Sequence, residues 1–208
     1  MRRVPGHTSM IDMNRLLPLL LLLGSALPAM AHPAAFHAGS PNAATASGFL
    51  HPFTGPDHLL VMVAVGLWAV QLGGRALWML PCAFILPMIL GGLAGIGSMP
   101  RPMIEHGIGA SMLLLGAALG MAWKPRLSIA LAVVVLSGAC HGFAHGAEMP
   151  QGVAPGLFLM GMVAATVTLQ AIGILFATTL GGSRFASAIR AAGCGLIAVA
   201  AYSFIPAA

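Results

Sequence analysis

The sequence predicts an all-α membrane protein, a polytopic bundle of six transmembrane helices after a cleaved signal peptide. Of its 208 residues, 59% are hydrophobic and only 6% are charged, whereas a soluble domain carries roughly 25% charged residues. The apolar residues also fall into separate runs, several of which reach the length of about 20 residues that a membrane-spanning helix needs. The composition excludes a soluble globular domain. The formal net charge of +5 is carried by residues too sparse to form a nucleic-acid-binding face.

The first expected element is a signal peptide over residues 1–31. Several arginines precede an apolar run at residues 16–27, and Ala31 closes a small-x-small pattern of the kind that a signal peptidase cuts. Because this run is short for a membrane span, we expect cleavage rather than a retained anchor. The mature chain then begins at His32, outside the cytoplasm. The sequence leaves open whether translation starts at the first methionine or at Met13.

Six later runs form a single expected transmembrane domain over residues 32–208. They cover residues 49–71, 76–96, 103–123, 127–147, 153–180 and 186–206. Their orientation follows from Lys and Arg, because cytoplasmic loops carry an excess of these residues. With the amino terminus outside, the inner loops hold Arg75, Lys124, Arg126, Arg184 and Arg190, and the outer loops hold only Arg101. This asymmetry supports an outside amino terminus.

Every His, Asp and Glu after the signal peptide maps to the outer part of the expected bundle. Ionisable side chains at membrane depth are costly, so they mark a functional site. Spacings of four and three residues place His141, His145 and Glu148 on one helix face. Imidazole together with carboxylate suits a borderline divalent metal such as Ni, Co, Zn or Cu. The candidate metal ligands are His32, His37, His51, Asp57, His58, His141, His145 and Glu148, and Glu105 and His106 are candidate pathway residues.

The first expected span contains a break. Pro52, Gly55 and Pro56 lie between His51 and His58, and proline removes a helix hydrogen bond while its ring clashes with the preceding turn. We therefore expect a broken helix here. The exposed backbone groups at such a break are tolerated in a membrane only where they line a protein cavity or water.

Two motifs resemble a known family. Residues 51–58, His-Pro-Phe-Thr-Gly-Pro-Asp-His, with residues 62–68 after them, closely resemble the opening motif of the HupE/UreJ family of nickel permeases. Residues 141–148, His-Gly-Phe-Ala-His-Gly-Ala-Glu, are similar to its second signature, and Glu105 with the glycines after it is similar to its third-span pattern. The resemblance implies a bacterial inner-membrane permease for Ni²⁺, or for Co²⁺ in some members. It also implies a link to hydrogenase or urease maturation, with the metal ion as cargo and no cofactor.

One position departs from this resemblance. Gln170, in the fifth span, stands where we expect many relatives to have a histidine. Thr166 and Gln170, one helical turn apart, are then weaker oxygen ligands on the pathway of the ion.

Two other classes of protein remain open from the sequence. The first is an intramembrane zinc enzyme, with His141 and His145 as metal ligands and Glu148 as a third ligand or base. Against it, Ala144 rather than Glu precedes His145, so the H-E-x-x-H pattern is not formed. The second is a metal sensor or chaperone that hands the ion to a partner, which the short connections between spans argue against. We expect a transporter rather than an enzyme.

Overall fold

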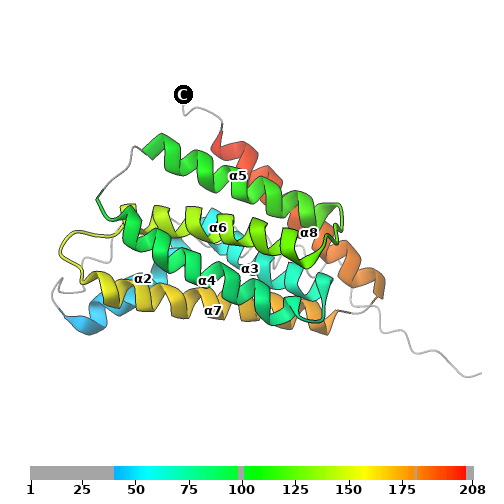
Figure 1. The fold of residues 1–208 in the computed structure, drawn as a ribbon, viewed down its shortest axis with the longest axis horizontal. Helices are drawn as coiled ribbons and strands as arrows, with labels where there is room; N and C mark the ends of the chain where they lie inside the picture. Colours follow the sequence, from blue (N-terminus) through cyan, green and yellow to red (C-terminus); the bar gives the residue numbers. More distant parts are fainter. Residues whose placement is uncertain (1–39, 98–100, 181, 205–208) are drawn as a thin grey trace, which may run out of the picture. The chain divides into compact units, whose positions relative to one another are not determined.

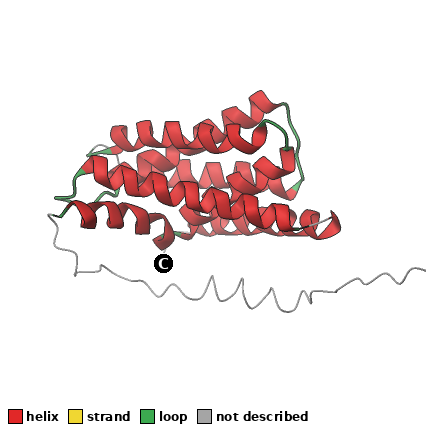
Figure 2. Cartoon of the chain, turned by 90° about the horizontal axis from the view of Figure 1, so that it is seen from below, coloured by secondary structure: helices red, strands yellow, loops and turns green. Residues whose placement is uncertain are grey.

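The structure, a computed structural model, describes residues 40–97, 101–180 and 182–204. These residues form α-helices, and no strand is found among them (Figures 1 and 2). The helices are α2 (Pro41–Thr54), α3 (Pro56–Leu72), α4 (Ala76–Gly95), α5 (Arg101–Gly120), α6 (Leu127–Ala147), α7 (Pro155–Thr179) and α8 (Gly182–Ser203). The all-α prediction is confirmed. The predicted signal peptide, with His32 and His37 after it, lies outside the described residues.

The helices are those of a membrane protein. Four of them, α4, α6, α7 and α8, are long and apolar enough to cross a membrane, and a fifth span is counted if α2 and α3 are taken together. The helix α5 carries Glu105 and His106 near its start and is not among the four. The sixth predicted crossing therefore stays a prediction.

The predicted span over residues 49–71 is not one continuous helix. The helices α2 and α3 meet at Gly55 with a bend of 86°, so the expected break is found. Pro56 is the first residue of α3, a position where its missing N–H leaves no helix hydrogen bond unmade. A Cβ atom on Gly55 would lie 2.6 Å from Oδ1 of Asp57, so a larger residue at the corner would displace that carboxylate.

The helices α4 and α6 pack backbone against backbone. Cβ atoms added to the glycines of α6 would lie closer than 3.0 Å to carbonyl oxygens of α4, in the pairs Gly138 with Phe84, Gly142 with Met88 and Gly146 with Gly92. Small residues permit such close approach between membrane helices. The residue numbers rise together along both helices, so α4 and α6 run parallel. The chain between them, which includes α5, must therefore return across the bundle.

The helix α7 contacts both halves of the broken segment. Gly161 of α7 lies against the backbone of Thr45 in α2, and Gly66 of α3 lies against the backbone of Gln170. Figure 1 shows α2 beside one end of α7 and α3 behind the layer formed by α4 and α6. These contacts hold the corner between α2 and α3 beside the start of α7.

At the opposite end of α3, two side chains attach the loop after α5. Nε1 of Trp68 and Nε2 of Gln71 both donate hydrogen bonds to the carbonyl oxygen of Trp123, at 3.2 and 3.0 Å. The rings of Trp68 and Trp123 also stack, with centroids 6.4 Å apart. The carbonyl of Trp123 lies after the end of α5 and accepts no hydrogen bond of that helix. The two bonds from Trp68 and Gln71 therefore fix the loop that follows α5 to α3.

Candidate metal centre

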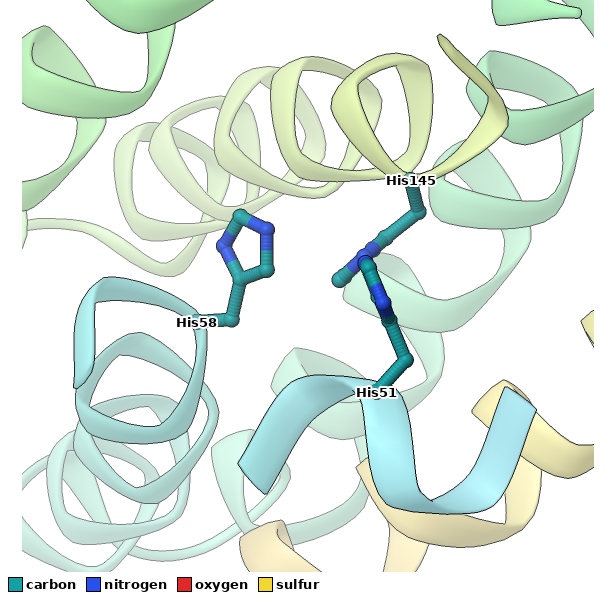
Figure 3. A group of neighbouring side chains, drawn as sticks. All are labelled: His51, His58 and His145. Carbon is teal, nitrogen blue, oxygen red and sulfur yellow. The ribbon is translucent and has the colours of Figure 1, made fainter. Parts of the chain in front are cut away.

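Three histidines from three helices converge at the corner between α2 and α3. His51 comes from the end of α2, His58 from the first turn of α3 and His145 from the last turn of α6, and Figure 3 shows their rings turned toward a common space. One ligand nitrogen of each lies within 4.8 Å of the other two. A metal ion that holds nitrogens at about 2.1 Å brings them within about 4.2 Å of each other. A small inward movement of this three-histidine group would therefore close it on one ion.

The ring nitrogens of this group are short of hydrogen-bond partners. His145 is fully buried, and neither of its ring nitrogens has a partner among the described residues. Nε2 of His51 and Nδ1 of His58 are also buried, and each lies 3.4 Å from a carboxylate oxygen. Leaving a ring nitrogen of His145 unpaired costs about 1–3 kcal/mol, and a neutral imidazole nitrogen is a common metal ligand. Metal binding would offset this cost.

Two carboxylates border the three-histidine group. Oε2 of Glu148 lies 3.4 Å from Nε2 of His51 and 3.8 Å from Nε2 of His58. Oδ2 of Asp57 lies 3.4 Å from Nδ1 of His58, in the first turn of α3, where the helix dipole stabilises a negative charge. Partial burial raises the pKa of Glu148, but the side chains of His51 and His58 lower it more, to about 2. Two carboxylate charges can balance the charge of one divalent cation.

A fourth imidazole, that of His141, lies one turn before His145 on α6. Its ring is fully buried, with its centroid 5.3 Å from that of His58. Nδ1 of His141 lies 3.0 Å from the carbonyl oxygen of Ser137 and 3.3 Å from Oγ of Ser111. When Nδ1 donates its proton to that carbonyl, Nε2 is left with a free lone pair and no hydrogen-bond partner. A backbone acceptor commonly orients metal-binding histidines in this way.

The structure does not bring every predicted residue to this place. Glu105 and His106 are exposed on α5, and His106 stacks on Phe204, with centroids 5.7 Å apart. Neither is among the described groups that contact the three histidines. Thr166 and Gln170 are buried in α7. They follow Gly161, the residue of α7 that contacts α2, by about one and two helical turns.

Several residues of the site were not anticipated from the sequence. Phe158 packs against the ring of His51, and Phe84 against that of His141, with centroids 5.6 and 6.1 Å apart. Ser137 could have been found, because it precedes His141 by one turn on the same helix face. The two phenylalanines could not, because they come from other helices.

An apolar helical bundle with buried histidines converging at one end defines a membrane protein with a candidate metal centre. The chain matches the HupE / UreJ protein family over residues 20–203. It is 38% identical over 179 residues to Protein HupE of Rhizobium leguminosarum bv. viciae, an alignment that covers 86% of this chain and 92% of that protein. The chain belongs to the HupE/UreJ family, and the resemblance drawn from its motifs is confirmed. No solved structure matches it.

Proposed function

We propose that the chain is a secondary transporter of the bacterial inner membrane that takes up Ni²⁺ or Co²⁺. The main observation in its favour is the convergence of three imidazoles from three helices, with ligand nitrogens within 4.8 Å of one another. Nitrogen and oxygen ligands of this kind suit Ni²⁺ and Co²⁺. Membership of the HupE/UreJ family supports transport over catalysis, and the metal is cargo rather than a cofactor. The family also suggests that the metal serves hydrogenase or urease maturation.

In this proposal the ion is captured at the outer end of the bundle. His51, His58 and His145 replace part of its hydration shell, and Glu148 lies close enough to both His51 and His58 to become a further ligand. Asp57 lies beside Nδ1 of His58, so it orients that ring and raises its basicity, as carboxylates do beside other metal-binding histidines. His141 then offers Nε2 as the next ligand inward.

The same proposal includes six crossings and a periplasmic amino terminus. The parallel direction of α4 and α6 supports a crossing by α5, because the chain has to return between them. The placement of Arg and Lys in alternate loops supports the orientation. A membrane potential that is negative inside favours inward movement of a divalent ion by about 4.6 kcal/mol per 100 mV. The potential, or coupling to the movement of another ion, supplies the energy for uptake.

The amino-terminal histidines complete the proposed ligand set. Cleavage after Ala31 would give His32 a free α-amine beside its imidazole, and both can bind one ion. Pro33 has no N–H to lose, so further ligands have to come from elsewhere, with His37 nearest in the sequence. One alanine inserted before His32 in the mature chain should then weaken the affinity for Ni²⁺ without removing any side chain. Equal affinities by isothermal titration would exclude the amine as a ligand.

The test is ⁶³Ni²⁺ uptake by proteoliposomes that contain only this chain. We expect uptake by the unaltered protein and its loss in Asp57→Asn, which keeps the size of the side chain but removes its charge. Thr168→Val is the control, because it removes a polar group of similar size at an exposed position of α7. An unaltered protein that accumulates no Ni²⁺ or Co²⁺ would refute the transport proposal. Near-normal uptake by Asp57→Asn would refute the assignment of the capture site alone.

A further inference from the structure

A second group of unusual buried atoms lies further into the bundle than the three-histidine group. Oγ1 of Thr166 in α7 lies 3.4 Å from Sδ of Met62 in α3 and 3.3 Å from Sδ of Met88 in α4. All three side chains are fully buried. Two thioether sulfurs and one hydroxyl oxygen from three different helices therefore meet at one point.

The sulfurs keep lone pairs that hydrogen bonding does not use. The hydroxyl group of Thr166 has one proton and three neighbouring acceptors. The carbonyl oxygen of Met162, at 2.9 Å, is the nearest of them, and a carbonyl is a far stronger acceptor than a thioether. Once the proton is donated to Met162, the oxygen of Thr166 and the sulfurs of Met62 and Met88 face one another with electron pairs only. Such an arrangement suits a cation.

Gln170 supplies a further polar group, one turn along α7 from Thr166. Its side chain is 2% exposed, and neither Oε1 nor Nε2 has a hydrogen-bond partner among the described residues. An unpaired buried amide is costly. The backbone of Gln170 is held against Gly66 of α3, so the residue cannot move away from this position without disturbing the contact between the two helices. Among the described residues the amide has no partner, so both of its polar atoms are available to a ligand.

The order of residues along the helices connects this group to the three-histidine group. Met62 follows His58 by one turn on α3. The backbone of Met88 packs against Gly142, which lies between His141 and His145 on α6. An ion that leaves His58 and His141 inward therefore meets Met62 and Met88 next, and then Gln170.

We propose that Met62, Met88, Thr166 and Gln170 form a thioether site, a second and weaker binding site that the transported metal ion occupies after the histidines. The inference rests on the proposed transport function. Thioether sulfur favours soft and borderline ions, whereas Mg²⁺, Ca²⁺ and Mn²⁺ prefer hard oxygen ligands. The site thus selects a second time against hard divalent ions. It contains no carboxylate, so it binds the ion weakly enough to release it, as conduction through successive sites requires.

The test replaces both sulfurs in the double variant Met62→Leu/Met88→Leu. Leucine is close to methionine in volume and usually fits the same space. The matched control is Met121→Leu/Met160→Leu, the same pair of changes at methionines that are 70% and 62% exposed. We call Met62→Leu/Met88→Leu the buried pair variant. In proteoliposomes we expect its Ni²⁺ uptake to fall about tenfold or more relative to the unaltered protein. The affinity of the outer site for Ni²⁺, measured by isothermal titration in detergent, should stay unchanged, as should uptake by the control.

Silver binding gives a readout that does not depend on transport. Ag⁺ is a soft probe of thioether sulfur, and the three cysteines are the same in all variants. Titration in detergent should show one bound Ag⁺ fewer in the buried pair variant than in the unaltered protein and in the control. If the buried pair variant binds one Ag⁺ fewer but the unaltered protein transports no Ni²⁺, the thioether site is upheld as a metal site and the transport proposal is refuted. Normal Ni²⁺ uptake by the buried pair variant would overturn the inference while the transport proposal stands.

Gln170→Leu is a second variant in case the double replacement disturbs folding. It leaves both sulfurs in place and removes only the unpaired amide. We expect slower Ni²⁺ uptake with unchanged Ag⁺ stoichiometry and an unchanged outer-site affinity. Uptake at the rate of the unaltered protein in Gln170→Leu would exclude the amide from the thioether site.

Discussion

Gly142→Ala tests whether the glycine contact between α4 and α6 positions the metal site. A Cβ atom at this residue would lie 2.6 Å from both Cα and the carbonyl carbon of Met88, whereas ordinary contact begins at 3.4 Å. The neighbouring atoms are backbone, so they cannot rotate away, and the two helices have to separate by about 1 Å. Overpacking of this kind costs about 1–3 kcal/mol of folding free energy. For a protein of this size that corresponds to a fall in Tm of about 2–12 °C.

The same separation should change metal binding, because Gly142 lies between His141 and His145. Metal sites require their ligands within about 0.5 Å of the productive geometry, so we expect the affinity for Ni²⁺ to fall about tenfold or more. The control is Gly195→Ala, a glycine within α8 whose added Cβ would meet nothing within 4 Å. Thermal unfolding and isothermal titration in detergent would measure both effects. If Gly142→Ala matched the control in Tm and in affinity, the close contact of α4 with α6 would not hold the histidines in place.

Three further predictions address the protonation state, the inner end of α3 and the exposed histidine. Because protons compete with metal for imidazole nitrogen, Ni²⁺ affinity should fall as the pH is lowered. Glu148, with its pKa lowered to about 2, stays ionised in weak acid, so the loss of affinity there would report on the histidines, and binding that persists unchanged down to pH 3 would contradict histidine ligation. Trp68→Phe removes one of the two hydrogen bonds to the carbonyl of Trp123 and should cost about 1 kcal/mol, or about 2–4 °C in Tm. An unchanged Tm would show that this bond is not formed. His106→Ala should leave Ni²⁺ affinity unchanged, and a loss of binding would return His106 to the site.

Much of the fold could be predicted because its signals are local. A run of about 20 apolar residues identifies a membrane helix by itself, and α4, α6 and α7 agree with their predicted spans to within a few residues. The break before Pro56 was also readable, since proline and glycine act on their own turn. The size of the bend, 86°, could not be predicted, because it depends on how α2 and α3 pack against α7.

The sequence by itself predicted that imidazoles and carboxylates gather toward one side of the membrane, since the predicted order of spans sets which end of each helix faces outward. It also placed His141 and His145 on one helix face, because that spacing is a property of a single helix. Only the tertiary structure decided that His51 and His58 meet His145 while His106 stays exposed. In a membrane helix nearly every side chain is apolar, so hydrophobic periodicity does not show which face meets which neighbour. Which helix faces pack together depends on where glycines let two backbones approach, as at Gly142 and Met88. These contacts between helices are seen only in the packed structure.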